Sequence, residues 1–246
     1  MNTSRQVDAY SIGWDVGGWN CDRNAKSRDA IVILNENLGI VGMPWRGNLR
    51  ETINKSSTSQ DWVSQLFGLC KSSLTHNNFE VTLAIDTPLG FSTEFQSLIT
   101  SRMAQSIVGR SDTNQYLYRR AERLLFERHK KPLSAIKDMI GSQATKGMHV
   151  LAKFARNVQS CGVWSDSGRN LIAIEAYPAS CKESRLIKAL LNGIKLPATN
   201  EDIRDAAICA VVAHIFRTNR GKLWSPSNEI PTNEGWIWLP KDAFAT

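Results

Sequence analysis

Short apolar runs with strand character alternate with longer segments of helical spacing along this 246-residue chain. β-branched and apolar residues concentrate in five stretches that we predict as strands, at 10–17, 29–34, 39–45, 80–86 and 169–177. Trp62, Leu66 and Leu69 recur at helical spacing, and Thr58 or Ser59 precedes them as a candidate cap, which predicts a helix to about residue 75. Two more helices are predicted over 183–192 and 201–217.

Residues 91–165 differ from the rest because helical patterns replace the β-branched runs. We expect helices near 92–108, 117–129, 133–140 and 145–158. The whole order predicts an α/β protein with a mixed sheet flanked by helices, one domain over residues 1–246 that carries a helical insertion at 91–165. This order resembles the ribonuclease H-like fold, with the insertion placed before its fifth strand.

Four carboxylates lie where burial usually excludes them. Asp15, Asp86 and Glu175 lie at or near the ends of the apolar runs SIGWDV, VTLAIDTP and LIAIEAYP, and Asp205 belongs to the apolar helical stripe IRDAAICAVVAHIF. Acids are rarely buried unless they are paired or bind a metal. Acids this far apart in sequence therefore predict one shared cation site.

The three strand acids share a local pattern. A small residue precedes each acid by two positions, in Gly-Trp-Asp, Ala-Ile-Asp and Ala-Ile-Glu, so it lies on the same face as the acid. Pro88 and Pro178 follow soon after and end the last two strands. The acids would then lie at the carboxyl ends of strands, where open α/β sheets place their sites.

Asp202 and Asp205 have different explanations. Asp202 fits a capping box with Thr199 as the cap, which is a structural alternative to metal binding. Asp205 lies beyond the capping positions and shares a helical face with apolar residues such as Cys209 and Val212. It should point toward the strand acids, unless it pairs with a base such as Arg204 or Arg120.

Clustered carboxylates repel each other and need cations. Ligation by oxygen alone suits Mg²⁺ or Mn²⁺, and two such ions about 4 Å apart can act on a phosphodiester. We therefore expect two Mg²⁺ or Mn²⁺ ions as cofactors.

The composition gives little information about the class of molecule that the protein binds. The net charge is +7, and basic residues concentrate between Tyr116 and Lys137, which favours a nucleic-acid partner but equally fits a solvated helix face. No run spans a bilayer, the start lacks an apolar signal core, and the five cysteines show no CxxC spacing, so we expect a cytoplasmic protein with reduced thiols. Trp236 and Trp238 fit either an interface or packing on the sheet, so no oligomeric state is predicted.

The motifs GWDVGG, AIDTPLGFS, YLYRRAERLLFE, AIEAYPAS, DIRDAAICAVVA and EGWIWLP occur in this order. Together the motifs resemble the domain-of-unknown-function family 429, whose members are predicted nucleases with a ribonuclease H-like fold, related to Holliday-junction resolvases. The resemblance implies metal-binding roles for Asp15, Asp86, Glu175 and Asp205, with Asp202 as a less regular extra position. It also places Arg119, Arg120 and Glu122 on the family's arginine-acid motif, where Arg120 would bind phosphate and Glu122 would orient it.

Three functions remain open at this point. The first is an enzyme, a metal-dependent nuclease that cleaves DNA or RNA, with Asp15, Asp86, Glu175 and Asp205 as catalytic acids and Lys26 or Arg120 on phosphate. The second is a nucleotide-binding or phosphotransfer protein of the actin and sugar-kinase type, because Asp15-Val-Gly-Gly resembles their first phosphate loop. The third is a non-catalytic nucleic-acid-binding module.

Overall fold

Within the described residues, seven strands form one mixed sheet in the order β3-β2-β1-β4-β7-β6-β5. The computed structural model describes residues 7–24, 26–74, 78–197 and 200–244. The strand bounds are β1 Asp8–Asp15, β2 Asp29–Leu34, β3 Trp45–Gly47, β4 Phe79–Asp86, β5 Asn157–Ser160, β6 Val163–Ser165 and β7 Leu171–Glu175. Strands β1, β4 and β7 are parallel neighbours, whereas β2 is antiparallel to β1 and β6 is antiparallel to β7.

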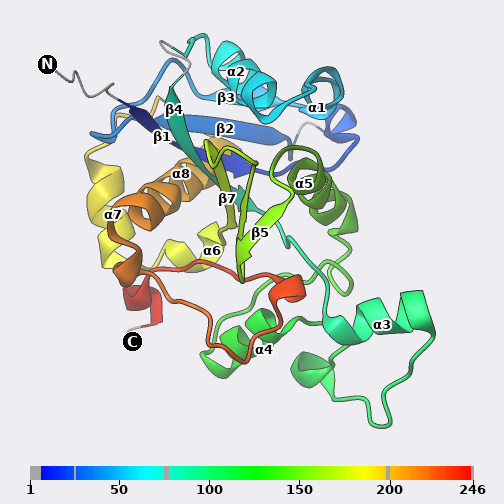
Figure 1. The fold of residues 1–246 in the computed structure, drawn as a ribbon. Coiled ribbons are helices and arrows are strands. Elements are labelled where there is room, and N and C mark those ends of the chain that lie inside the picture. Colours follow the sequence, from blue (N-terminus) through cyan, green and yellow to red (C-terminus); the bar gives the residue numbers. More distant parts are fainter. Residues whose placement is uncertain (1–6, 25, 75–77, 198–199, 245–246) are drawn as a thin grey trace, which may run out of the picture.

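Helices cover both faces of this sheet (Figure 1). The α-helices are α1 Arg50–Lys55, α2 Ser59–Leu69, α3 Thr93–Ser101, α4 Arg120–Glu127, α5 Gly141–Phe154, α6 Pro178–Cys181, α7 Arg185–Asn192 and α8 Glu201–Asn219. The short 3-10 helices are η1 Cys21–Arg23, η2 Ser111–Thr113, η3 Arg220–Lys222, η4 Thr232–Glu234 and η5 Lys241–Phe244. The predicted α/β class with a mixed, helix-flanked sheet is confirmed.

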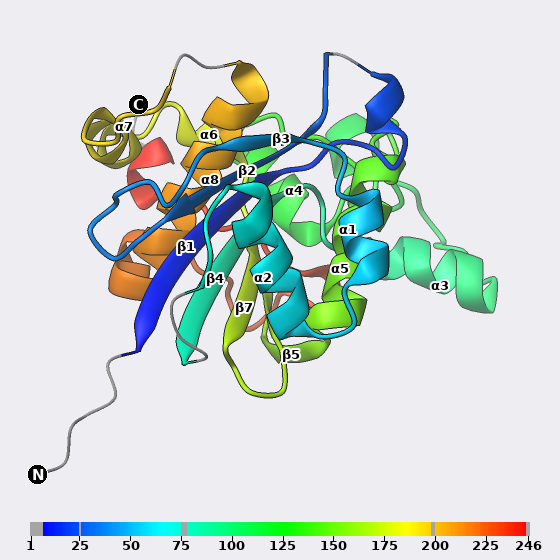
Figure 2. The ribbon, with the colours of Figure 1, turned by 90° about the horizontal axis from the view of Figure 1, so that it is seen from above.

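Two apolar cores lie on opposite faces of the sheet. Side chains of α1, α2 and α5 form one core with residues such as Trp14 and Ile85. Helix α8 forms the other with Ala84 and Ile174, and the C-terminal segment joins it through Trp238. Figure 2 shows α2 and α5 on one side of the strands and α7 and α8 on the other. The structure is therefore a three-layer sandwich in which α8 packs mainly on β1, β2 and β4.

The strands and helices outside the insertion largely match the sequence prediction. Strand β2 occupies the predicted residues, β1, β4 and β7 differ by one or two residues at their ends, and α7 and α8 begin and end near the expected positions. Thr58 caps α2 in a capping box with Asp61, as one of the two proposed caps. The expected edge strand at 39–45 is wrong: Ile40 forms an isolated bridge to Leu34, Gly42 has a positive φ of 70°, and β3 begins at Trp45. Helix α2 ends at Leu69, before the expected residue 75, and Lys71 just after it is left-handed.

The predicted helix at 133–140 is wrong. The Ser134 hydroxyl donates to the Leu117 carbonyl and accepts the backbone N–H groups of Ile136 and Lys137. Asp138 in turn accepts the Ser134 N–H at 2.8 Å. Side-chain bonds of this kind compete with helical backbone bonds, so the segment forms turns.

The insertion is also less helical than predicted at its end. Helix α5 ends at Phe154, and the chain then forms the β5–β6 hairpin, which extends the sheet beyond β7. Helix α3 ends early because Arg102 adopts a left-handed conformation. Figure 1 shows α3 and the loop after it projecting away from the sheet.

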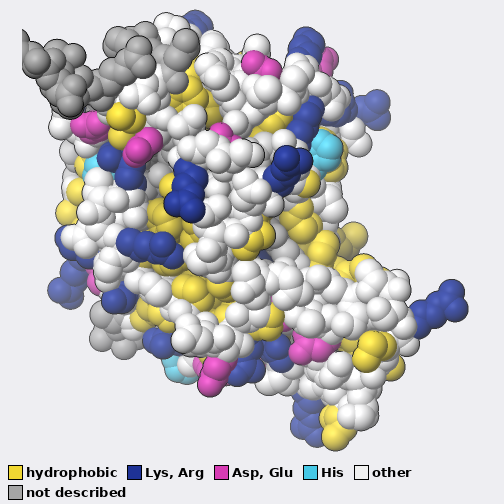
Figure 3. All heavy atoms as spheres, viewed as in Figure 1, with side chains coloured by type: hydrophobic (Ala, Val, Ile, Leu, Met, Phe, Trp, Pro, Cys, Tyr) yellow, Lys and Arg dark blue, Asp and Glu magenta, His cyan; other side chains and the backbone are white. Residues whose placement is uncertain are grey.

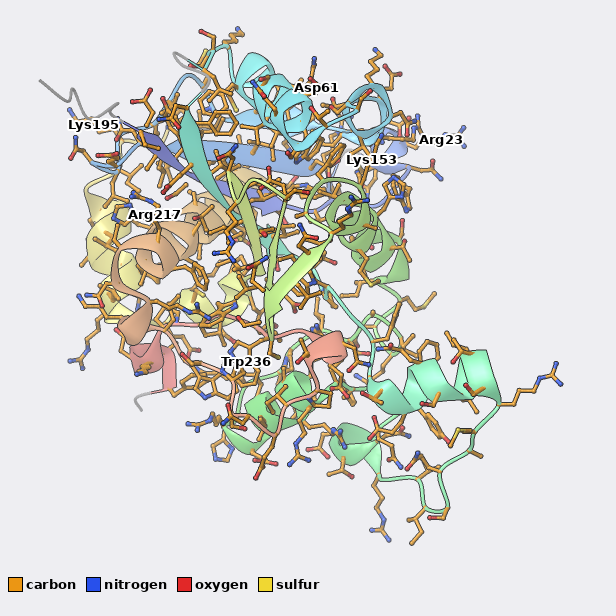
Figure 4. All side chains as sticks on the ribbon, viewed as in Figure 1. Arg23, Asp61, Lys153, Lys195, Arg217 and Trp236 are labelled. Carbon is orange, nitrogen blue, oxygen red and sulfur yellow. The ribbon has the colours of Figure 1, made fainter. Side chains whose placement is uncertain are left out.

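Both tryptophans of the C-terminal segment are buried. Trp238 Nε1 donates to the Gly162 carbonyl at 2.8 Å, and Trp236 Nε1 donates to the Trp224 carbonyl at 2.8 Å. Trp236, labelled in Figure 4, lies on the segment that crosses below the sheet. Of the two roles open from the sequence, the structure shows packing within the chain.

Candidate active site

Asp15 and Asp86 lie side by side at the ends of neighbouring parallel strands. They are direct partners in the β1–β4 register, as are Gly13 and Ala84 two residues earlier. Ala84 belongs to the core on the α8 face, so both carboxylates belong to that face too. The structure therefore brings together the first two acids of the predicted site.

Gly13 explains the small residue that precedes Asp15. A Cβ atom on Gly13 would lie 1.8 Å from the Ala206 carbonyl oxygen and 2.3 Å from the Ala210 nitrogen. Glycine is required because the α8 backbone lies directly against β1. Helix α8 thus occupies the space beside Gly13 and carries Asp205 close to the strand ends.

The electrostatics of this pair favour protonation in the absence of a cation. Burial, followed by the charge of Asp86, raises the pKa of Asp15 to about 9. Burial, followed by the charges of Asp205 and Glu175, raises the pKa of Asp86 to about 8. Each carboxylate is therefore costly to ionise beside the other, and a bound cation would relieve that cost.

Asp205 is partly buried on α8 and forms an ion pair. The Lys182 Nζ atom lies 2.8 Å from an Asp205 carboxylate oxygen. The base that pairs with Asp205 is Lys182, rather than Arg204 or Arg120, the examples suggested by the sequence. Burial raises the pKa of Asp205, although Lys182 opposes the rise. Asp205 still contributes to the field at the strand ends, because its charge raises the pKa of both strand acids.

Asp202 has a structural role that is not the predicted cap. The N-cap of α8 is Asn200, whose side chain accepts the Ile203 N–H at 3.1 Å; Thr199 lies outside the described residues. Asp202 instead accepts a bond of 2.6 Å from Arg46 Nε and one of 3.1 Å from the Arg28 N–H. It therefore fastens α8 to β3 and to the loop before β2.

Glu175 is turned away from the other two strand acids. Its register partner on β4 is Ile85 rather than Asp86, which assigns its side chain to the opposite face of the sheet. There the Arg119 guanidinium binds both carboxylate oxygens, at 2.6 and 2.8 Å, and the Leu89 N–H donates at 2.8 Å. With 3% of its surface exposed, Glu175 is a buried acid paired with Arg119, although its charge still raises the pKa of Asp86.

Glu122 orients Arg119, not Arg120 as the family resemblance implies. Glu122 accepts the Arg119 N–H at 2.8 Å and the Arg119 Nε–H at 2.9 Å. The Arg120 side chain is exposed, and its backbone N–H donates to Glu234 at 2.5 Å. Lys26 is exposed in the loop between β1 and β2. The charged ends of these two side chains form no ion pair or hydrogen bond with the described residues.

A cavity of about 190 Å³ opens between the strand ends and the insertion. Asp15, Asp86 and Glu175 line it from the sheet, Pro132 and Gln143 from the insertion, and Tyr177 from the segment after β7. The insertion thus forms a wall of the site.

Sequence reasoning missed a buried ion pair beneath the loop after β1. Lys146 of α5 and Asp29 of β2 are both fully buried and form an ion pair. Asp29 also accepts from Trp14 Nε1 at 3.0 Å and from the Gly17 N–H at 2.9 Å, and Lys146 Nζ donates to the Gly17 carbonyl at 3.2 Å. The pair fixes the loop that follows Asp15. Its only sequence signal is a lysine four residues before Val150 on a helix face that is otherwise apolar.

Within the described ranges, no group of three or more His, Cys, Asp or Glu residues is close enough to hold a metal ion by itself. The helices in the same ranges include none long and apolar enough to cross a membrane. No protein-family model, curated protein or solved structure matches the chain.

Proposed function

We propose that this protein is a Mg²⁺- or Mn²⁺-dependent enzyme that hydrolyses phosphodiester bonds in nucleic acid. The observation that carries the proposal is the in-register pair Asp15 and Asp86, two partly buried acids at adjacent parallel strand ends that face one cavity. Their raised pKa values are a sign of two carboxylates that share a site without a cation.

Two carboxylates fit a magnesium ion. Mg²⁺ is usually held by one or two carboxylates, and water and substrate phosphate complete its shell, so a closed cage of protein ligands is not required. Asp15 and Asp86 would supply those ligands, with Asp205 as a third once Lys182 releases it. A bound ion would polarise the phosphoryl oxygens and help to ionise the attacking water.

The element order supports the ribonuclease H-like assignment that underlies this function. Three antiparallel strands, a helical stretch, the parallel strand β4, the insertion and then β7 with α8 follow the expected order. We retain Asp15, Asp86 and Asp205 as ligand candidates. We assign Glu175 to the Arg119 network and Asp202 to the Arg46 ion pair, because these partners are more buried than Lys182, the partner of Asp205.

The net charge of +7 is consistent with a polyanionic substrate. Figure 3 shows Lys and Arg side chains spread over most of the visible face, not confined to the insertion. This distribution would give a general attraction for nucleic acid.

The nucleotide-binding alternative has less support. Its phosphate loop would use the backbone N–H groups of the Gly17-Gly18 turn. The Gly17 N–H already donates to Asp29, and Lys146 binds the carbonyls of both glycines. These bonds leave the loop poorly suited to wrap a phosphate.

The test is cleavage of labelled single- and double-stranded DNA and RNA with Mn²⁺ or Mg²⁺. Asp15→Asn and Asp86→Asn should each lower cleavage at least about 100-fold, because they remove a ligand charge while keeping side-chain size. Asp112→Asn is the matched control, since Asp112 is exposed on the insertion, and it should cleave like the parent protein. Circular dichroism checks that all three variants fold.

Undiminished cleavage by both Asp15→Asn and Asp86→Asn would refute the metal site. If no protein cleaves but nucleic acid binds with a steep salt dependence, the non-catalytic binding module is the correct function.

A further inference from the structure

The cavity beside the acid pair is larger and more apolar than a phosphate requires. Its walls away from the acids are formed by Pro88, Pro132, Leu133, Ile140, Tyr177 and Ile237. Leu133 is 49% exposed at this position, so part of its side chain is open to a bound molecule. A cavity of about 150 Å³ can hold one benzene molecule. The 190 Å³ here therefore suit one planar ring of slightly larger size.

Two residues of the cavity lining each carry a buried polar atom that lacks a partner. Gln143 Oε1 and Thr87 Oγ1 form no hydrogen bond with any of the described residues. Thr87 is only 5% exposed, and its methyl group lies against Gly147 of α5. A buried polar atom without a partner costs about 1–3 kcal/mol, so such atoms usually serve a ligand or a bound water.

Tyr177 supplies an aromatic wall that is held in place. Its hydroxyl donates to the Lys131 carbonyl at 2.8 Å, which ties the ring to the insertion. The ring is half-buried and lines the same cavity as Asp86. Because its hydroxyl is already bonded, the ring can offer a face for stacking without rearrangement.

We propose that this cavity binds one unpaired nucleobase. The size of the cavity fits a pyrimidine, and the base lies next to the phosphate that would contact the ion held by Asp15 and Asp86. Tyr177 contacts the ring of the base, and Gln143 and Thr87 bond its polar edge. The inference rests on the proposed nuclease function and adds a substrate class to it. A paired base cannot enter the cavity without leaving its stack, so single strands and unpaired positions are the substrates.

The first test places one abasic site in an otherwise unchanged single-stranded oligonucleotide and maps every cleaved bond in the presence of Mn²⁺. Cleavage of the bond next to the abasic site should fall about ten-fold, because stacking of a base on an aromatic ring contributes about 1–3 kcal/mol. The remaining bonds of the same molecule are the internal control. Cleavage should also be faster beside pyrimidines than beside purines.

The second test replaces the cavity residues Gln143 and Tyr177 one at a time. Gln143→Leu and Tyr177→Leu should slow cleavage beside a base about ten-fold yet leave the slow cleavage beside the abasic site unchanged. Gln65→Leu, on the exposed face of α2, should behave like the parent. If the rate of cleavage is the same beside the abasic site as beside a base, and is unchanged in these two variants, the base site is refuted while the proposed function stands. Equal cleavage beside purines and pyrimidines would refute the pyrimidine assignment.

A binding measurement covers the case in which no bond is cleaved and the nuclease function fails. Cytidine monophosphate is titrated calorimetrically into the full-length protein and into Gln143→Leu. Binding that weakens about ten-fold in the variant supports the base site. Absence of binding, or equal binding by both proteins, overturns it.

Discussion

At the scale of single residues, the acids of this protein divide by their partners. Asp15 and Asp86 are register partners at adjacent strand ends, whereas Glu175 is bound by Arg119 and Asp202 by Arg46. Burial and neighbouring acids raise the pKa values of Asp15 and Asp86. Asp205 is paired with Lys182, but we keep it as a candidate ligand because its charge acts on both strand acids.

This difference gives a pH prediction for Asp86→Asn. A carboxyl group whose pKa is raised from 3.8 to about 8 binds more protons in the folded chain than in the unfolded chain. Its contribution to stability therefore falls as pH rises through that window. Asparagine cannot ionise, so the variant should gain at least ~1 kcal/mol relative to the parent between pH 5 and pH 8. Urea unfolding at a series of pH values in the presence of a chelator measures the difference.

Added Mn²⁺ should reverse the order at pH 8. The ion would stabilise the parent protein by binding the ionised pair, and the variant would respond weakly. If Mn²⁺ does not change the urea unfolding midpoint of the parent protein, the metal site is contradicted, whatever the measurements with chelator show.

At the scale of elements, the contact of α8 with β1 positions the site. The α8 backbone reaches β1 only because Gly13 has no side chain, and this approach brings Asp205 near the strand ends. The opposite face uses the Asp29–Lys146 pair to hold the loop after Asp15. Contacts on both faces of the sheet therefore hold Asp15 and the loop after it in place.

Gly13→Ala should destabilise the fold by about 3 kcal/mol, the upper part of the range for overpacking. Its Cβ would lie 1.8 Å from backbone that cannot move alone. Gly68→Ala in α2 is the matched control, because no atom lies within 4 Å of its Cβ position. That variant should gain about 0.5–1 kcal/mol from helix propensity. Thermal and urea unfolding compare the two, and similar stabilities would refute the close contact.

At the scale of the whole molecule, Arg119 connects three parts of the chain. It precedes α4 in the insertion and binds Glu175 of β7, and its Nη1 donates to the Glu234 carbonyl in the C-terminal segment at 3.1 Å. Neighbouring Glu122 shares the same guanidinium. The insertion is thus fastened to the sheet beside the cavity that it helps to form.

Arg119→Met should therefore destabilise the protein by about 3–5 kcal/mol, since it leaves two buried acids without their cation. Arg123→Met in α4 should cost less than about 1 kcal/mol, because Arg123 and Glu94 form a longer and more exposed ion pair, at 3.7 Å. Denaturant unfolding of both variants checks the contrast. A mild effect of Arg119→Met would mean that the network does not hold the insertion.

The sequence by itself determined most of the elements outside the insertion, but it missed α1 and placed the third strand too early. Hydrophobic spacing and capping are local properties, so β2, α2, α7 and α8 could be predicted from their own residues. The turn at 133–140 and the β5–β6 hairpin could not, because bonds from Ser134 and pairing with β7 override local preference.

Only the tertiary structure decided which acids share a site. Asp15, Asp86 and Glu175 have the same local pattern, yet β7 is offset by one residue so that Glu175 pairs with Ile85. A shift of one residue turns a side chain to the other face of a sheet, and the register between distant strands has no local signal. The partners Lys182, Arg46 and Lys146 are likewise brought in from other elements. The chain thus encodes candidate acids locally, and long-range packing selects among them.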